Sequence, residues 1–109
     1  MSHEMLGRNK AGEEVAYARF SMRNYNAFIL YDLLDANVFN AGVSGSGNSS
    51  SFTNLQMEKA LNAWRKLNGN NDVLSQNGAE NWDRKQINIF ILNCFKTAQK
   101  EGSVNVSFF

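Results

Sequence analysis

The stretch Phe52-Thr53-Asn54-Leu55-Gln56-Met57 decides the fold, because it fixes where a helix begins. Thr53 is a preferred N-cap residue, and Gln56, three positions later, completes a capping box. Phe52 is placed to pack on Met57 as a hydrophobic staple. Apolar residues then recur at helical spacing as far as Asn68-Gly69: Met57, Ala60, Leu61, Trp64 and Leu67. We expect a helix whose first turn begins at Asn54.

Just upstream, the string Gly42 to Ser50 (GVSGSGNSS) resembles the phosphate-binding P-loop G-x-x-x-x-G-K-[ST], with Asn48 in place of the lysine. A P-loop needs a buried strand before the glycines and a helix directly after them. The capping box places the helix at Asn54, whereas P-loop geometry would start it near Gly47. The string is therefore interpreted as a glycine- and serine-rich connector, and a nucleotide hydrolase or kinase is not expected.

The same segment allows a different kind of site. Its backbone N–H groups and serine hydroxyls can surround a small anion or the backbone of a partner. The candidate ligand or partner loop consists of six residues: Ser44, Gly45, Ser46, Gly47, Asn48 and Ser49. This gives an alternative function, a small-anion or phosphate-ligand binder that uses residues 42–51.

Upstream of the connector, residues 6–22 predict a β-hairpin. Asn9 to Gly12 suits its turn, with Gly12 in the left-handed conformation. In the return strand, Ala16, Ala18 and Phe20 share the face expected to meet the core, and Arg19 lies on the opposite face. A short strand is also expected within residues 38–43.

Two further helices are expected. The first helix is capped by Asn24 or Asn26 and runs through Ala27–Leu34. It is apolar around nearly its whole circumference, so we expect a central helix. Asn37 is expected to end it in the left-handed conformation. Asn81 caps the second, which Gly102 stops, after a polar loop over residues 70–80. Val104, Val106 and Phe108 then alternate with polar residues as a final strand.

These elements predict one α+β domain over residues 1–109, with a small, mostly antiparallel sheet covered on one face by three helices. The sheet consists of the N-terminal hairpin and the C-terminal strand. If residues 104–109 form an edge of the sheet, a homodimer or a partner strand can pair there, whereas a position between two strands removes that hypothesis.

Composition excludes several classes of function. The net charge is +1 and the basic residues are scattered, so no nucleic-acid surface is expected. The longest apolar run, Ala27 to Tyr31, is far too short to span a membrane, and a cytoplasmic location is expected. His3 and Cys94 are each the only residue of their type, so neither a metal site, a disulfide nor a cofactor is expected.

No catalytic signature is present. Asp32 and Asp35 are considered as paired carboxylates for an enzyme, and are interpreted as solvated or as partners of Arg19 or Arg23. Cys94 is expected in the core. The leading hypothesis is a small non-catalytic protein-binding module, of the inhibitor, immunity or mobile-element accessory type, that acts through surface loops or a sheet edge. Its candidate partner surface consists of Arg23, Tyr25 and Trp82.

Overall fold

Two alternating segments from opposite ends of the chain form the middle of the sheet. The computed structural model describes residues 2–22, 24–68 and 79–109. β1 (Ser2–Arg8) and β2 (Glu14–Ser21) form the predicted antiparallel hairpin, and Gly12 in its turn has a φ of 85°. β4 (Ser103–Phe108) pairs antiparallel with β1, so the prediction that the last strand joins the hairpin is confirmed.

The fourth strand was not predicted. β3 (Ser49–Thr53) lies within the expected connector and pairs antiparallel with β4, which gives the strand order β2-β1-β4-β3. Its serines carry no apolar alternation, so the strand exists because β4 supplies the ladder of hydrogen bonds. The strand expected within residues 38–43 is wrong: the chain forms a 3-10 turn, η1 (Asn37–Phe39), and an isolated bridge between Asn40 and Gly45.

Side-chain caps fix where the first two helices begin. In α1 (Tyr25–Leu33), the Asn24 side chain accepts a hydrogen bond from the Asn26 N–H at 2.9 Å. In α2 (Asn54–Asn68), the Thr53 N–H donates to Gln56 Oε1 at 2.8 Å, and the Gln56 N–H donates to Thr53 Oγ1 at 3.2 Å. The predicted capping box and helix start are confirmed.

Two predicted helix boundaries are wrong. α3 (Ala79–Glu101) begins before Asn81, the expected cap. The left-handed residue after α1 is Asp35, with a φ of 54°, rather than Asn37, which lies in the 3-10 turn. Asparagine and aspartate both tolerate this conformation, so residue type alone could not choose between them. The C-terminal stop is as predicted, with Gly102 at a φ of 91°.

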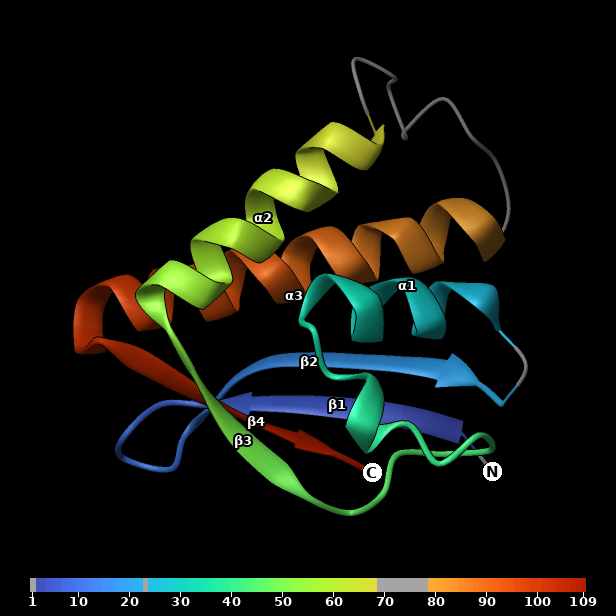
Figure 1. Cartoon of the computed structure of the whole chain (residues 1–109), viewed down its shortest axis with the longest axis horizontal. Helices are drawn as coiled ribbons and strands as arrows, with labels where there is room; N and C mark the ends of the chain where they lie inside the picture. Colours follow the sequence, from blue (N-terminus) through green and yellow to red (C-terminus); the bar gives the residue numbers. More distant parts are fainter. Residues whose placement is uncertain (1, 23, 69–78) are drawn as a thin grey trace.

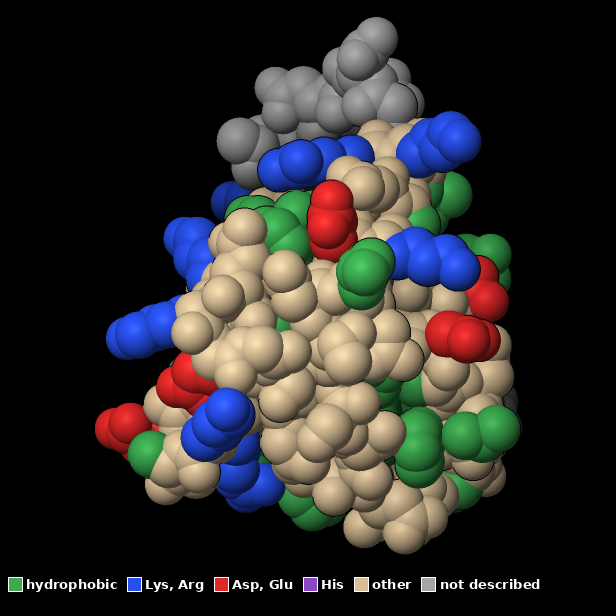
Figure 2. All heavy atoms as spheres, turned by 60° about the vertical axis from the view of Figure 1, so that its left-hand side comes forward, with side chains coloured by type: hydrophobic (Ala, Val, Ile, Leu, Met, Phe, Trp, Pro, Cys, Tyr) green, Lys and Arg blue, Asp and Glu red, His purple; other side chains and the backbone are tan. Residues whose placement is uncertain are grey.

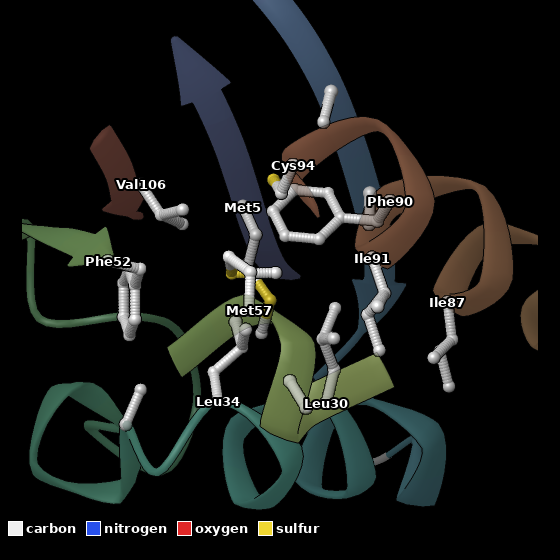
Figure 3. Close-up of a cluster of buried hydrophobic side chains, with 14 of the residues drawn as sticks. Met5, Leu30, Leu34, Phe52, Met57, Ile87, Phe90, Ile91, Cys94 and Val106 are labelled. Atoms are coloured by element: carbon white, nitrogen blue, oxygen red, sulfur yellow. The ribbon is translucent and has the colours of Figure 1, made fainter. Parts of the chain in front are cut away.

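All three helices cover one face of the sheet (Figure 1), which confirms the α+β prediction. The core lies between the two layers. Figure 3 shows Met57 of α2 and Met5 of β1 near its centre, with Leu30 of α1 and Phe90 of α3 around them. Arg19 is on the other face of the sheet and exposed, as predicted.

Phe108 of β4 organises the aromatic part of the core. Its ring stacks on Phe39 at 4.9 Å and on Tyr31 at 5.7 Å, and meets Phe52 edge-on at 6.3 Å. His3 continues this group: the ring is fully buried, with Nδ1 3.0 Å from the Tyr31 hydroxyl and Nε2 3.2 Å from the Met22 carbonyl oxygen. The lone histidine is thus a hydrogen-bonded core residue.

Candidate functional site

The predicted ligand loop is folded back on the end of the chain. The Gly45 N–H donates to the Phe109 carbonyl at 2.6 Å and the Gly47 N–H to the Phe108 carbonyl at 2.7 Å. Between them, the Ser46 N–H donates to the Phe39 carbonyl at 2.8 Å. Three successive amides that an anion would need are therefore engaged with protein carbonyls.

The side chains of this loop are also partly engaged. Ser44 Oγ donates to the Gly45 carbonyl at 3.0 Å, and Asn48 Nδ2 donates to Ser46 Oγ at 3.2 Å. Ser49, the last residue of the candidate loop, is exposed and begins β3. Gly47 leads into a strand and the next helix begins only at Asn54, so the helix-register mismatch with a P-loop is confirmed.

Two of the three residues of the predicted partner surface lie near the starts of α1 and α3. Tyr25 is 73% exposed and Trp82 is 62% exposed. Asn24 Nδ2 donates to Asp83 Oδ2 at 2.6 Å, so the residues directly preceding Tyr25 and following Trp82 are joined. Arg23 lies outside the described residues, as do residues 70–78 of the predicted loop; Ala79 and Glu80 belong to α3.

The structure adds a groove between α1 and α2. One hollow of about 350 Å³ lies between α1, η1 and the C-terminal part of α2, and a second of about 460 Å³ lies between the end of α1 and the first half of α2. Both are lined by Asp32 and Leu33, and the two adjoining hollows are together called the α1–α2 groove here. Its apolar lining consists of Tyr25, Phe28, Ile29, Leu33, Leu34, Ala63 and Leu67.

α1, expected to be a central helix, contacts the core on one side and borders the groove on the other. One side of the helix packs into the core through Ala27, Leu30 and Tyr31. On the groove side, Phe28 and Ile29 remain half-buried. The helix is apolar all round because it serves both the core and the groove.

The charges on the groove are unpaired within the described part of the chain. Asp32 on α1 and Asp35 just after its end are exposed, and the Asp32 carboxylate accepts a hydrogen bond from Asn37 Nδ2 at 3.4 Å. Lys59 lies on the opposite wall, and the only ion pair found among the described residues joins Arg19 to Glu4 at 3.6 Å. Arg19 is therefore not the partner of the two aspartates.

The acidic pair shows no feature of an acid–base centre. Catalytic carboxylates are tuned by burial or by a close charged neighbour, and both aspartates are exposed with no ion pair among the described residues. The strongest pKa shifts belong to core groups instead: burial raises the pKa of the Cys94 thiol and that of the Tyr31 hydroxyl to about 12. Cys94 is fully buried, as predicted.

Most of the groove was not predicted from the sequence. The apolar circumference of residues 27–34 predicts a central helix without distinguishing a groove side, and helical spacing places Leu67 on the core stripe of α2. Leu67 is 59% exposed, since α2 runs obliquely across the helical layer (Figure 1) and its last turn leaves the core. The sequence signal for the groove was the composition of α1, because a helix that contacts the core on one side needs an apolar stripe on that side only.

Within residues 2–22, 24–68 and 79–109, no helix is long and apolar enough to cross a membrane. The same residues contain no group of three or more metal-ligating side chains. Comparison of the chain with models of protein families, with curated proteins and with solved structures finds no match.

Proposed function

We propose that this protein is a small non-catalytic protein-binding module that holds an amphipathic helix of a partner protein in the α1–α2 groove. The observation that carries the proposal is the exposure of apolar side chains on one helix: Tyr25 is 73% exposed, and Phe28, Ile29 and Leu33 are half-buried beside it. A groove between two helices suits a third helix, whose apolar residues at i, i+3, i+4 and i+7 would fill it.

Tyr25 is the best anchor for such a partner. An aromatic ring offers a large apolar area with few rotatable bonds, and aromatic side chains dominate the binding energy of protein interfaces. Leu67 faces the same hollow from α2 and is also exposed. Covering both side chains removes apolar surface from water, which favours association by about 25 cal/mol per Å² buried.

The charges of the groove specify the partner further. Asp32 and Asp35 are without an ion pair among the described residues, so a lysine or arginine on the partner helix is favoured opposite them. Lys59 on the other wall favours a single carboxylate on the opposite side of that helix. The proposed partner is therefore an apolar helix with a net basic face toward α1.

The anion-binding alternative has less support than the groove. Three amide donors of the Ser44–Ser49 loop already bond to carbonyls, and a ligand would have to displace those bonds. The composition and the buried lone cysteine favour the cytoplasm as the proposed compartment.

Site-specific photo-crosslinking tests the groove. p-Benzoylphenylalanine replaces Tyr25 in one variant and Tyr17, which is 47% exposed on the open face of the sheet, in a matched control. We expect a discrete protein adduct at position 25 in the native cell and none at position 17. Asp32→Asn should weaken capture of the same protein at least threefold, whereas the exposed Glu14→Gln, with the same change of charge, should leave it unchanged.

Two outcomes would contradict this proposal. An equal yield of crosslinked protein at positions 17 and 25 would mean that the partner does not bind preferentially at the groove. Loss of capture in Glu14→Gln to the same extent as in Asp32→Asn would mean that net charge, rather than the groove, governs binding.

A further inference from the structure

The two edge strands of the sheet, β2 and β3, differ in whether their outward backbone groups have hydrogen-bond partners. At the β2 edge, the Arg19 N–H donates to Gln86 Oε1 at 3.0 Å, and Gln86 Nε2 donates to the Arg19 carbonyl at 3.0 Å. The side-chain carboxamide of Gln86, from α3, thus makes the two hydrogen bonds that a neighbouring strand would make with Arg19. Proteins commonly protect exposed edges in such ways, because unpaired backbone groups recruit other strands.

Among residues 2–22, 24–68 and 79–109, none covers the β3 edge in this way. The Phe108 N–H donates to the Asn48 carbonyl at 2.9 Å, and the Asn54 N–H donates to the Gly102 carbonyl at 3.2 Å. Because bonding alternates along an antiparallel pair, Ser50 also bonds toward β4, and the backbone groups of Ser49 and Ser51 point outward.

Nothing in the described chain fills these outward positions. The Thr53 N–H, next along the same side, is taken by Gln56 in the capping box. Ser49 and Ser51 are both exposed. The free part of the edge is therefore confined to two residues, each with one donor and one acceptor.

The surroundings of this edge carry no charge. No Lys, Arg, Asp or Glu occurs from Ala36 through Met57, and the chain has no proline. Figure 2 turns this side of the molecule forward: uncharged surface fills the middle, and charged side chains lie mostly toward the margins. Exposed apolar side chains occur in the same segment, with Val38 at 84% and Leu55 at 70%. The charged residues and prolines that usually protect an edge are thus missing.

We propose that β3 is a self-association edge, at which a second copy of this chain pairs antiparallel so that two sheets join into one. The free groups fix the register: Ser49 of one copy opposes Ser51 of the other, and the reverse. Each such pair exchanges two hydrogen bonds, so the contact forms four. Only this register uses both free residues of both copies.

A second copy is the favoured occupant because the edge is self-complementary. Twofold pairing brings identical segments together, and any charge near the axis would face its own copy. The uncharged segment 36–57 removes that repulsion. The dimer replaces the one expected through residues 104–109, since β4 is paired on both sides. This inference does not rest on the α1–α2 groove.

A cysteine at the twofold axis tests the register. Ser50 would face Ser50 of the second copy as a non-hydrogen-bonded pair, with Cα atoms about 4.5 Å apart, within the range of a disulfide. We expect Ser50→Cys to form a covalent dimer under mild oxidation. Ser103→Cys, half-buried in the interior strand β4, should stay monomeric, and the native Cys94 is buried in both variants.

Sedimentation equilibrium tests association without a crosslink. The 12.3 kDa chain should show a dimer of twice that mass as its concentration rises. Ser49→Lys combined with Ser51→Lys places like charges opposite each other and should raise the dimer dissociation constant at least tenfold. Ser21→Lys with Asn62→Lys adds the same charge at exposed positions on β2 and α2, away from the β3 edge, and should not.

Two results would contradict the proposal that β3 is a self-association edge. A monomer at every concentration up to the millimolar range, with no Ser50→Cys dimer, would exclude the second copy. If the chain stays monomeric and another protein crosslinks at position 50, the edge serves a different partner and the self-association proposal is wrong. Circular dichroism of each lysine variant establishes that the fold is retained.

Discussion

At the scale of single residues, Gly45 shows how a glycine can be needed for space. A Cβ at this position would overlap the backbone of Phe108 and lie 2.6 Å from the Phe109 nitrogen. Its neighbours Gly42 and Gly47 differ, since they have φ values of 97° and 85° and open space around them. The sequence predicts flexible glycines equally at all three sites, because close approach by a strand some 60 residues away leaves no local signal.

We expect Gly45→Ala to destabilise the protein by about 2 to 3 kcal/mol, because the methyl group must push backbone apart. Gly12→Ala is the control: Gly12 has a φ of 85° and nothing within 4 Å of the added Cβ, so only the left-handed conformation costs energy, about 1 kcal/mol. Urea unfolding followed by circular dichroism gives both values. A Gly45→Ala protein as stable as the parent would refute the close packing of this loop on β4.

At the scale of elements, the N-terminus of α2 was fully predictable. Thr53 and Gln56 bond to each other's N–H within one turn, so all the information lies in four consecutive residues. The hairpin is similarly local. β3 is the opposite case, because its serines become a strand only through β4. The position of α1 was predicted, but its groove was not, because apolarity alone does not say how much of a helix is covered.

Thr53→Ala should lower the free energy of unfolding by about 1 kcal/mol, the usual loss for an N-cap. Gln56→Ala should also destabilise, and the double variant should lose less than the sum, because each side chain bonds to the backbone of the other. Asn62→Ala, exposed in the middle of α2, is the matched control and should be neutral or slightly stabilising. Additive losses in a double-mutant cycle would argue against the capping box.

At the scale of the whole molecule, two buried groups link stability to pH. Burial raises the pKa of Cys94 from 9.0 and that of Tyr31 from 10.0, each to about 12. Both ionise more readily in the unfolded chain, so unfolding releases protons above pH 9. The free energy of unfolding should therefore be unaffected by these groups below pH 9. It should fall by about 1.4 kcal/mol per pH unit for each group once its unfolded form has ionised.

The variant Cys94→Ala isolates the thiol. In urea unfolding between pH 8 and pH 10.5, its stability should be lower throughout because a buried side chain is shortened, but its decline should begin near pH 10 instead of pH 9. Tyr31 remains in both proteins and supplies the later decline. Parallel curves for the two proteins across pH 9 to 10 would mean that Cys94 is not buried as the structure has it.

The sequence by itself determined the α+β class, the hairpin, the start of α2 after the Thr53 cap, and the stop at Gly102, and it limited the cap of α1 to Asn24 or Asn26. These depend on hydrogen bonds and periodicities within a few residues. Only the tertiary structure decided that Ser49–Thr53 is an edge strand, that three N–H groups of the Ser44–Ser49 loop donate hydrogen bonds to backbone carbonyls, and that α1 and α2 leave a groove. Each depends on segments distant along the chain, and long-range contact leaves no mark on the local pattern of residues.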